Sequence, residues 1–150
     1  MELKIEEISL DEIKVVGNNL FNENDIYTQY YYSFKNLENL LESYLKKNND
    51  KFLKITYFRT IVGLITLRGY DEGFKIPRFG IYVYSSHSKK GIGRLATSLF
   101  LEMCVVKYDI DILELKVSKK NNSAIKIYNE LGFKIIKSLK NDYLMNIKLK

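Results

Sequence analysis

Hydrophobic residues in the first third of the chain recur with the period of a helix. Ser9 and Glu12 have the spacing of a capping box, in which each side chain bonds the backbone of the other where a helix begins. The apolar residues that follow are spaced by three and four positions and predict an early helix: Ile13, Val16 and Leu20. Residues 37–45 repeat this period and predict a second helix. The loop expected between them contains four tyrosines: Tyr27, Tyr30, Tyr31 and Tyr32.

After residue 51 the hydrophobic period shortens to two, the period of a β-strand. Residues 52–58 and 61–67 predict two strands, and the gap of two residues, Arg59 and Thr60, predicts a hairpin. The later elements are expected as a loop at 69–77, a strand at 79–84, a helix at 91–108, a strand at 112–117, a helix at 122–131 ended by Gly132, and strands at 133–136 and 143–149. With a first strand before residue 9, the order β-α-α-β-β-β-α-β-α-β-β predicts an α/β (α+β) fold. Its central sheet is mixed, with about seven strands and about four flanking helices.

Length and composition limit the classes of protein. The chain has 150 residues, of which 46% are hydrophobic and 13% aromatic, and it has no internal repeat and no Gly/Ser/Pro-rich linker. These features exclude extended disorder and predict one domain over residues 1–150. The longest apolar runs are far shorter than the roughly 18 residues of a membrane span. The acidic N-terminus does not resemble an export signal, so we expect a cytoplasmic protein.

The cysteine and histidine content excludes two kinds of site. Cys104 is the only cysteine and His87 the only histidine, so the chain can form neither an internal disulfide nor a Cys/His zinc site. We therefore predict no metal. Cys104 lies in the middle of a predicted apolar helix, which indicates a buried, unreactive thiol and not an acyl carrier.

Positive charge is concentrated in the second half of the chain. The net charge is +6, but residues 1–75 hold 10 Lys and Arg against 12 Asp and Glu, whereas residues 76–150 hold 14 against 6. Such an excess favours an anionic partner: nucleic acid, an acidic surface or a phosphorylated small molecule. Charge alone does not choose among these partners, and a general bias toward lysine explains the excess without any of them.

A pair of glycines marks the start of the helix predicted from residue 91. The segment consists of Ser88, Lys89, Lys90, Gly91, Ile92, Gly93 and Arg94. A helix start has backbone N–H groups without helical partners and a partial positive charge, so this segment predicts an anion site surrounded by basic side chains. The pattern is not the longer P-loop, and it is not a full G-x-G-x-x-G because residue 96 is alanine. Alone, it also fits a loop that needs flexible residues.

A second motif follows at residues 121–133. The pattern Asn-x-x-Ala-x-x-x-Tyr-x-x-x-Gly-Phe is formed by Asn121, Ala124, Tyr128, Gly132 and Phe133. Together with the glycine pair, this pattern resembles the GCN5-related N-acetyltransferase (GNAT) superfamily, whose acetyl-coenzyme A loop is Gln/Arg-x-x-Gly-x-Gly/Ala. Val62 and Gly63 in the preceding hairpin are similar to that family as well. The resemblance is specific from about residue 61 to residue 133.

The resemblance implies the GNAT fold, acetyl-CoA as cosubstrate and a set of site residues. The pyrophosphate is expected on the backbone N–H groups of residues 89–94, and the pantetheine is expected to pair with residues 81–83 like an extra strand. The implied coenzyme-binding residues are Ile81, Tyr82, Val83, Ser88, Lys89, Lys90, Gly91, Ile92, Gly93, Arg94, Asn121 and Tyr128. Ser88 stands where the family has Gln or Arg, which removes a side-chain contact with the coenzyme. The family gives the tyrosine at position 128 the role of the acid that protonates the departing thiolate.

We therefore expect an N-acetyltransferase that acts on the primary amine of a small molecule: a polyamine, an amino sugar or an amino acid derivative. The amine is expected to attack the thioester directly, with a backbone N–H near Val83 stabilising the oxyanion. A protein N-terminal or lysine acetyltransferase is an alternative, weakened by Lys116 where some of these enzymes carry a catalytic Glu. A non-catalytic coenzyme-binding or nucleic-acid-binding module is another. Tyr128 and the glycine pair argue against a purely structural role, and nucleic acid is the less favoured partner.

Three features stay open at this point. The candidates for the general base are Glu114, Asp71, Glu72, Tyr31, Tyr32 and His87. The acceptor pocket is expected near the tyrosine cluster and the loop at 69–77, where Asp71 and Glu72 suggest an acidic wall for a polyamine; core or lid packing explains the tyrosines equally well. The strand at 143–149 either completes the sheet or pairs with a second chain, so a homodimer is one outcome.

Overall fold

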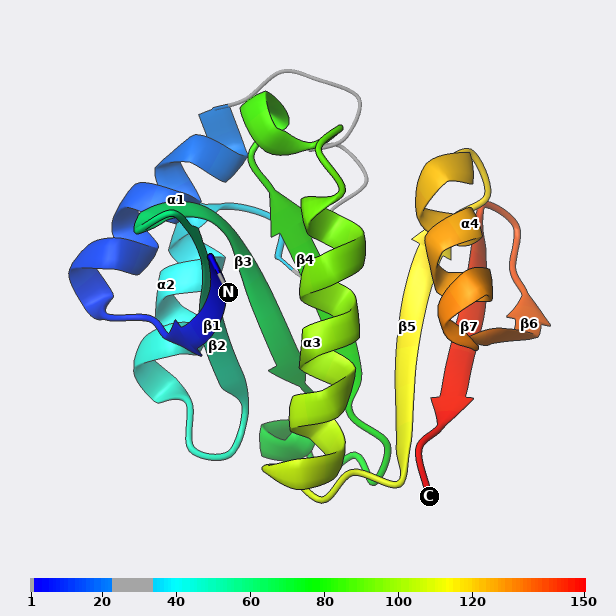
Figure 1. Cartoon of the computed structure of the whole chain (residues 1–150). Helices are drawn as coiled ribbons and strands as arrows, with labels where there is room; N and C mark the ends of the chain where they lie inside the picture. The colour runs from blue at the N-terminus through cyan, green and yellow to red at the C-terminus, as the bar shows by residue number, and fades with distance from the viewer. Residues whose placement is uncertain (1, 23–33) are drawn as a thin grey trace.

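In the part of the chain that the structure describes, seven strands form one mixed sheet with two α-helices on each face (Figure 1). The computed structural model describes residues 2–22 and 34–150. The strands are β1 (Leu3–Glu7), β2 (Lys51–Tyr57), β3 (Thr60–Arg68), β4 (Arg78–Val83), β5 (Ile112–Ser118), β6 (Lys134–Ser138) and β7 (Asp142–Lys148). In these residues the α-helices are α1 (Leu10–Asn22), α2 (Leu37–Lys46), α3 (Ile92–Val106) and α4 (Asn122–Leu131), and the short 3-10 helices are η2 (Tyr70–Glu72) and η3 (Ser85–His87). The predicted fold class and order of elements are confirmed, and the single domain over residues 1–150 stays a prediction.

The sheet contains one parallel pair, between β4 and β5. The strand order is β1-β2-β3-β4-β5-β7-β6, and all other neighbours are antiparallel. β4 and β5 are in register only at Arg78 and Glu114, where Arg78 Nε donates to Glu114 Oε2 at 2.7 Å. Beyond this pair the two strands diverge (Figure 1). β7 pairs with both β5 and β6, so the strand predicted at 143–149 completes the sheet.

Local hydrogen bonds explain where the helices begin and end. The capping box of α1 is formed: the Ser9 N–H donates to Glu12 Oε1 at 3.0 Å, and the Glu12 N–H donates to Ser9 Oγ at 3.2 Å. Asn36 caps α2 by accepting the Asn39 N–H at 2.7 Å. α4 ends at Gly132, whose φ of 108° is accessible to glycine at little cost. None of the helices in residues 2–22 and 34–150 is long and apolar enough to cross a membrane.

The hairpin between β2 and β3 turns one residue earlier than predicted. Phe58 and Arg59 occupy the turn with φ of 49° and 69°, so the prediction of Arg59 and Thr60 is wrong. Two consecutive residues with positive φ fit the twist of a two-residue hairpin. Thr60 instead begins β3 and pairs with Tyr57. Neither turn residue is the Asn or Gly that usually marks such a turn, so the sequence does not indicate where the turn lies.

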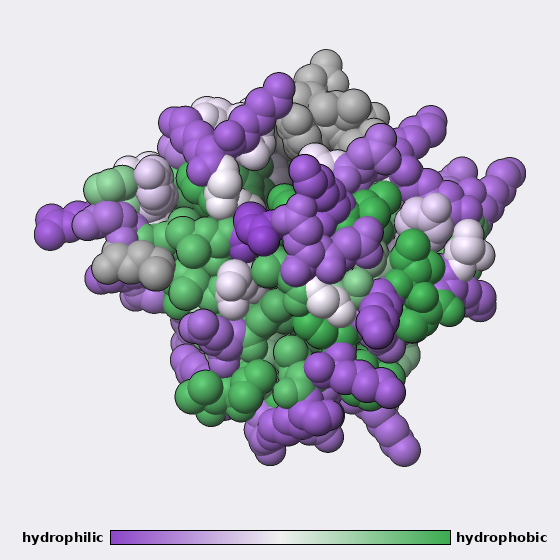
Figure 2. Space-filling view, turned by 45° about the vertical axis from the view of Figure 1, so that its right-hand side comes forward, coloured by the Kyte–Doolittle hydropathy of each residue, from purple (hydrophilic) through white to green (hydrophobic). Residues whose placement is uncertain are grey.

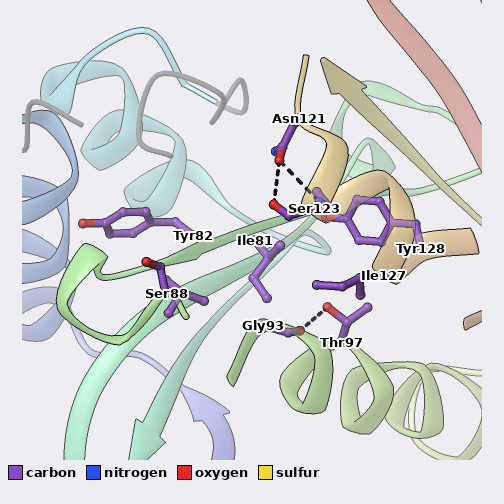
Figure 3. A pocket seen from close by; sticks show the side chains of 11 residues that line it. Ile81, Tyr82, Ser88, Gly93, Thr97, Asn121, Ser123, Ile127 and Tyr128 are labelled. Atoms are coloured by element: carbon purple, nitrogen blue, oxygen red, sulfur yellow. Dashed lines mark hydrogen bonds between the residues drawn. The ribbon is translucent and has the colours of Figure 1, made fainter. Parts of the chain in front are cut away.

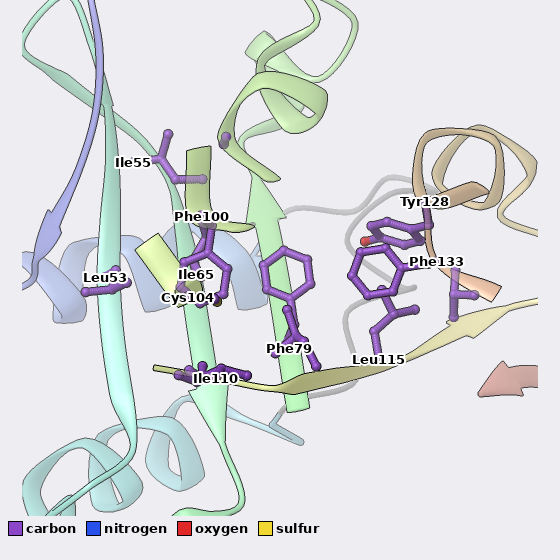
Figure 4. Close-up of a cluster of buried hydrophobic side chains, with 14 of the residues drawn as sticks. Leu53, Ile55, Ile65, Phe79, Phe100, Cys104, Ile110, Leu115, Tyr128 and Phe133 are labelled. Atoms are coloured by element: carbon purple, nitrogen blue, oxygen red, sulfur yellow. The ribbon is translucent and has the colours of Figure 1, made fainter. Parts of the chain in front are cut away.

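Alternation along β4 separates two hydrophobic clusters on the two faces of the sheet. Phe79 and Ile81 face α3 and α4, and the Phe79 ring stacks on Phe100 with 5.2 Å between centroids (Figure 4). Tyr82 faces the other way and packs with α1 and α2. β4 is thereby fixed from both sides, so its position relative to α3 is set by the core.

Gly63 allows β3 and β4 to lie close together near the end of β4. It pairs with Val83, and a Cβ atom at position 63 would lie 2.2 Å from the carbonyl oxygen of Tyr82. That separation is far inside van der Waals contact with backbone atoms, which cannot move independently of β4. Any side chain at this position must therefore displace β3 or β4.

We predict that Gly63→Ala lowers the free energy of unfolding by about 1–3 kcal/mol, the cost of overpacking a rigid interior. Gly93→Ala is the control, because its Cβ would lie 4.0 Å from its nearest neighbour. Alanine also favours helix over glycine by up to about 1 kcal/mol, so this control should be as stable as wild type or more so. Urea unfolding of the three proteins measures the difference. Equal stability of Gly63→Ala and wild type would contradict the close approach.

Cys104 provides a prediction about alkaline pH. Its side chain is fully buried, and burial raises the pKa of the thiol to about 12. The native state therefore holds this proton more tightly than the unfolded state, whose thiol titrates near pH 8.5, and rising pH favours unfolding. We expect the free energy of unfolding to fall by about 2 kcal/mol between about pH 8.5 and 10 because of Cys104. Unfolding free energies of wild type and Cys104→Ala across this range should show a shallower decline in the variant; identical slopes would show that the thiol is not held neutral.

Candidate active site

A pocket lies at the end of the sheet where β4 and β5 have separated. It is bounded by β4, the start of α3 and the start of α4 (Figure 3) and measures about 670 Å³ when its open mouth is included. The residues that line it are Ile81, Tyr82, Val83, Ser88, Gly93, Thr97, Asn121, Ser123, Ala124, Ile127 and Tyr128. The two motifs, far apart in the sequence, therefore meet in one cavity.

The exposed edge of β4 forms one wall of the pocket. Ile81 points toward Ile127 of α4, whereas Tyr82 points away (Figure 3). The Tyr82 hydroxyl donates to Asn19 Oδ1 of α1 at 2.5 Å. Past Arg78, β4 has no partner strand on its β5 side among the described residues. Backbone groups on such an edge can bond an extended ligand that carries amides.

The start of α3 forms a second wall with free backbone donors. Gly91 precedes the helix with φ of 76°, and the helical hydrogen bonds begin with Leu95 N–H to the Gly91 carbonyl at 3.1 Å. The N–H groups of Ile92, Gly93 and Arg94 therefore have no partner in the helix ladder. With the positive end of the helix dipole, these donors suit a phosphate group.

Two side chains of this segment have other roles than binding a ligand. Ile92 is buried in the core at 2% exposure, so only its backbone is available to a ligand. Ser88 lines the pocket, but its Oγ donates to the Ser85 carbonyl at 2.9 Å and so stabilises the loop before α3. The coenzyme-binding role predicted for Ile92 therefore depends on its backbone atoms alone. Ser88 lies in the lining of the pocket.

Basic side chains surround the start of α3. Lys89 and Lys90 are exposed, and Arg94 forms an ion pair with Glu130 of α4. Lys120 and Lys126, near and on α4, are exposed as well. Figure 2, in which the molecule of Figure 1 is turned by 45°, shows hydrophilic side chains that project around patches of hydrophobic surface. This charge favours an anionic ligand at the mouth of the pocket.

α4 contributes the third wall. The Asn121 side chain accepts the Ala124 N–H at 3.3 Å and the Ser123 hydroxyl at 3.4 Å, which fixes the start of the helix at the pocket (Figure 3). The Asn121 amide group keeps its N–H donors for other partners. Asn121 thus combines a structural capping role with a place in the lining.

Tyr128 lies one helical turn after Ala124 on α4 and is almost fully buried at 9% exposure. Its ring makes edge contacts with Phe79 at 6.4 Å and with Phe133 at 5.6 Å, and its hydroxyl points from α4 toward β4 (Figure 4). Burial raises the pKa of this phenol above its usual value near 10. The hydroxyl therefore carries its proton at neutral pH and is available as a donor in the pocket.

The sequence predictions did not include four of the lining residues as ligands: Thr97, Ser123, Ala124 and Ile127. Thr97 lies one turn after Gly93, and its hydroxyl donates to the Gly93 carbonyl at 2.7 Å (Figure 3). Thr97 is four residues after Gly93 and Ala124 is four residues before Tyr128, so helical spacing would have indicated these two positions, because residues four apart share a helix face.

Asp71 and Glu72, expected to form an acidic wall of the acceptor pocket, do not line this pocket. Asp71 lies in η2, in the loop that precedes β4, whereas the pocket lies where β4 ends. Its carboxylate accepts the N–H groups of Asn48 and Asn49 at 2.9 and 2.7 Å, and these bonds hold the pKa of Asp71 below its usual range. Asp71 therefore ties two loops together, and the adjacent Glu72 pairs with Arg68.

None of the described candidates for the general base lines the pocket. Asp71 and Glu72 lie at the other end of the sheet, Glu114 pairs with Arg78, and His87 contacts the Ser86 hydroxyl through Nδ1 at 2.9 Å. Tyr31, Tyr32 and the rest of the tyrosine cluster lie outside the described residues. The base stays unassigned.

Comparisons with known proteins agree with this geometry. The model of the acetyltransferase (GNAT) domain matches residues 2–134. The spermidine N(1)-acetyltransferase of Escherichia coli K12 is 23% identical over 116 residues, which cover 77% of this chain but 62% of the relative. The matched part thus spans less than two thirds of that curated relative.

Solved structures share the fold over almost the whole chain. The spermidine N-acetyltransferase of Vibrio cholerae, crystallised with CoA and spermine, has a TM-score of 0.83 at 18% identity and covers 99% of this chain and 96% of its own. The N-acetyltransferase PseH of Campylobacter jejuni has a TM-score of 0.73 at 18% identity, with both chains fully covered. The sequence motifs, the fold and the domain match together show that this chain belongs to the GNAT acetyltransferase family.

Proposed function

We propose that this chain transfers the acetyl group of acetyl-CoA to the primary amine of a polyamine. The observation that carries the proposal is one pocket that joins the free edge of β4, the N–H groups at the start of α3 and the hydroxyl-bearing side chain of Tyr128. A strand edge, a phosphate cradle and a proton donor are the parts that this reaction needs, and family membership supports their use together.

The binding residues in this proposal follow from the walls of the pocket. Ile81, Tyr82 and Val83 offer backbone groups to the amide-bearing arm of the coenzyme, and residues 89–94 offer N–H groups to its pyrophosphate. Ile127 supplies an apolar surface facing Ile81, and Asn121 supplies amide donors. Lys89 and Lys90 add positive charge beside the cradle.

Tyr128 is proposed as the catalytic acid. Acetyl-CoA, when bound, supplies the acetyl group as a thioester. The amine nitrogen bonds to the carbonyl carbon, the carbon–sulfur bond breaks, and Tyr128 donates its phenolic proton to the leaving sulfur, which gives the N-acetylated amine and the free thiol. A backbone N–H near Val83 stabilises the charge on the carbonyl oxygen. The amine gives up its own proton to a base or to water, because only the neutral amine attacks.

A polyamine is favoured among the three expected acceptor classes by the relatives. The Escherichia coli and Vibrio cholerae enzymes are both spermidine acetyltransferases by name, and the latter was crystallised with spermine. No comparable support exists here for a protein substrate. The acceptor is therefore tested first with polyamines, with peptides as the contrasting class.

The expected result of an acceptor screen is release of free CoA thiol with spermidine or spermine at rates well above those with amino sugars, amino acids, and N-terminal or lysine peptides. Thiol release from acetyl-CoA, followed colorimetrically, measures each rate. Turnover restricted to amino sugars or peptides would contradict the proposed acceptor. Measurable CoA binding with no turnover on any amine would contradict the proposed reaction.

We predict that Tyr128→Phe lowers kcat by about 10²-fold or more, because the leaving thiolate loses its proton donor. CoA affinity and thermal stability should stay close to wild type, since the hydroxyl has no hydrogen-bond partner among the described residues. Tyr108→Phe is the control, because Tyr108 is a partly buried tyrosine that follows the far end of α3. Equal kcat values in wild type and Tyr128→Phe would contradict the proposal that Tyr128 is the catalytic acid.

The raised pKa of Tyr128 sets the sign of the pH dependence. The protonated phenol is the active form, so kcat should not fall as pH rises from neutral to about 9.5, below the ordinary phenol pKa near 10. Steady-state rates at saturating amine measure the profile. A decline centred below about pH 9 that disappears in Tyr128→Phe would show that the phenol titrates too early for this role.

A further inference from the structure

The ion pair between Arg94 and Glu130 crosses the space between α3 and α4. Arg94 is the third residue of α3, directly after Gly93, and Glu130 lies one turn after Ile127 on α4. Gly93 and Ile127 line opposite walls of the pocket. Among the described residues, this pair is the one hydrogen-bonded contact between the two helices, so it spans the same gap as the pocket.

Both charges sit at helix ends that disfavour them. Arg94 lies in the first turn of α3, where the helix dipole is positive, and Glu130 lies in the last turn of α4, where it is negative. Each placement costs local helix stability, and the contact between the two side chains offsets that cost. A cation in the first turn of a helix is better explained where an anion binds to the same turn.

The cations around the cradle differ in their partners. Lys89 and Lys90 have no acidic partner among the described residues, whereas Arg94 has Glu130. The Arg94 and Glu130 side chains are 47% and 41% exposed, so solvent screens the pair and it can open at low cost. A phosphate at the start of α3 would present more negative charge and more acceptor oxygens to the same guanidinium.

We propose that the Glu130 carboxylate competes with a coenzyme phosphate for Arg94. It pairs with Arg94 in the free protein and is displaced from Arg94 when the coenzyme binds. Glu130 thereby weakens coenzyme binding, because the coenzyme must compete for Arg94. This inference rests on the proposed function and deepens it, since it assigns an affinity-setting role to a residue that lies outside the lining of the pocket.

The test compares Glu130→Gln with wild type for two ligands. CoA carries the phosphates, and pantetheine lacks them. We expect Glu130→Gln to bind CoA about two- to fivefold more tightly, the scale of an exposed ion pair, with pantetheine affinity unchanged. Titration calorimetry measures the first affinity, and competition with acetyl-CoA turnover measures the second. Glu102→Gln, an exposed position on α3 away from this pocket, is the control and should match wild type.

The Arg94→Gln background isolates the interaction. If Glu130 acts through Arg94, the gain in CoA affinity should disappear when Glu130→Gln is combined with Arg94→Gln. Unchanged or weaker CoA binding by Glu130→Gln would overturn the inference. The proposed function would still stand in that case, provided that the wild-type protein binds CoA. Equal changes in affinity for CoA and pantetheine would also overturn the inference, because they would indicate that the Arg94–Glu130 ion pair only positions α3 relative to α4. Failure of wild type to bind CoA would overturn the proposed function itself.

Discussion

The single parallel contact between β4 and β5 is the constraint on which the rest of the structure depends. These strands are in register only at Arg78 and Glu114, and their separation beyond that pair leaves one edge of β4 without a neighbouring strand from residues 2–22 and 34–150. An exposed strand edge inside a sheet is costly unless something bonds to it. The sheet therefore carries a place for an extended ligand as a direct result of its topology.

The cores on both faces of the sheet fix this edge in position. Phe79 and Ile81 pack against α3 and α4 while Tyr82 packs against α1 and α2, so β4 cannot move toward β5 to close the gap. The same packing aligns the first turn of α3 with the end of β4 and brings Tyr128 to the opposite wall. The start of α3, the exposed edge of β4 and Tyr128 thus share one rigid frame.

The elements and several of the residues that line the pocket could be predicted from the sequence, because their signals are local. Helical periodicity, the Ser9–Glu12 box and the two motifs each involve residues close in the chain. The turn at Phe58 and the contacts of Asp71 were not predicted, for different reasons. The turn lacks a marking residue, and the role of Asp71 depends on backbone groups of a distant loop. The pairing of Arg94 with Glu130 is likewise tertiary and has no signature in either motif.

Amide chemical shifts during titration with CoA test the central claim most directly, because they locate the ligand without assuming a reaction. The account predicts the largest changes at the backbone N–H groups of residues 81–83 and 92–94 and at Asn121, with little change in β1 and α2. Changes confined to the lysines of β6, or spread along the basic surface without the start of α3, would contradict it. In that case the gap between β4 and β5 would not be the coenzyme site.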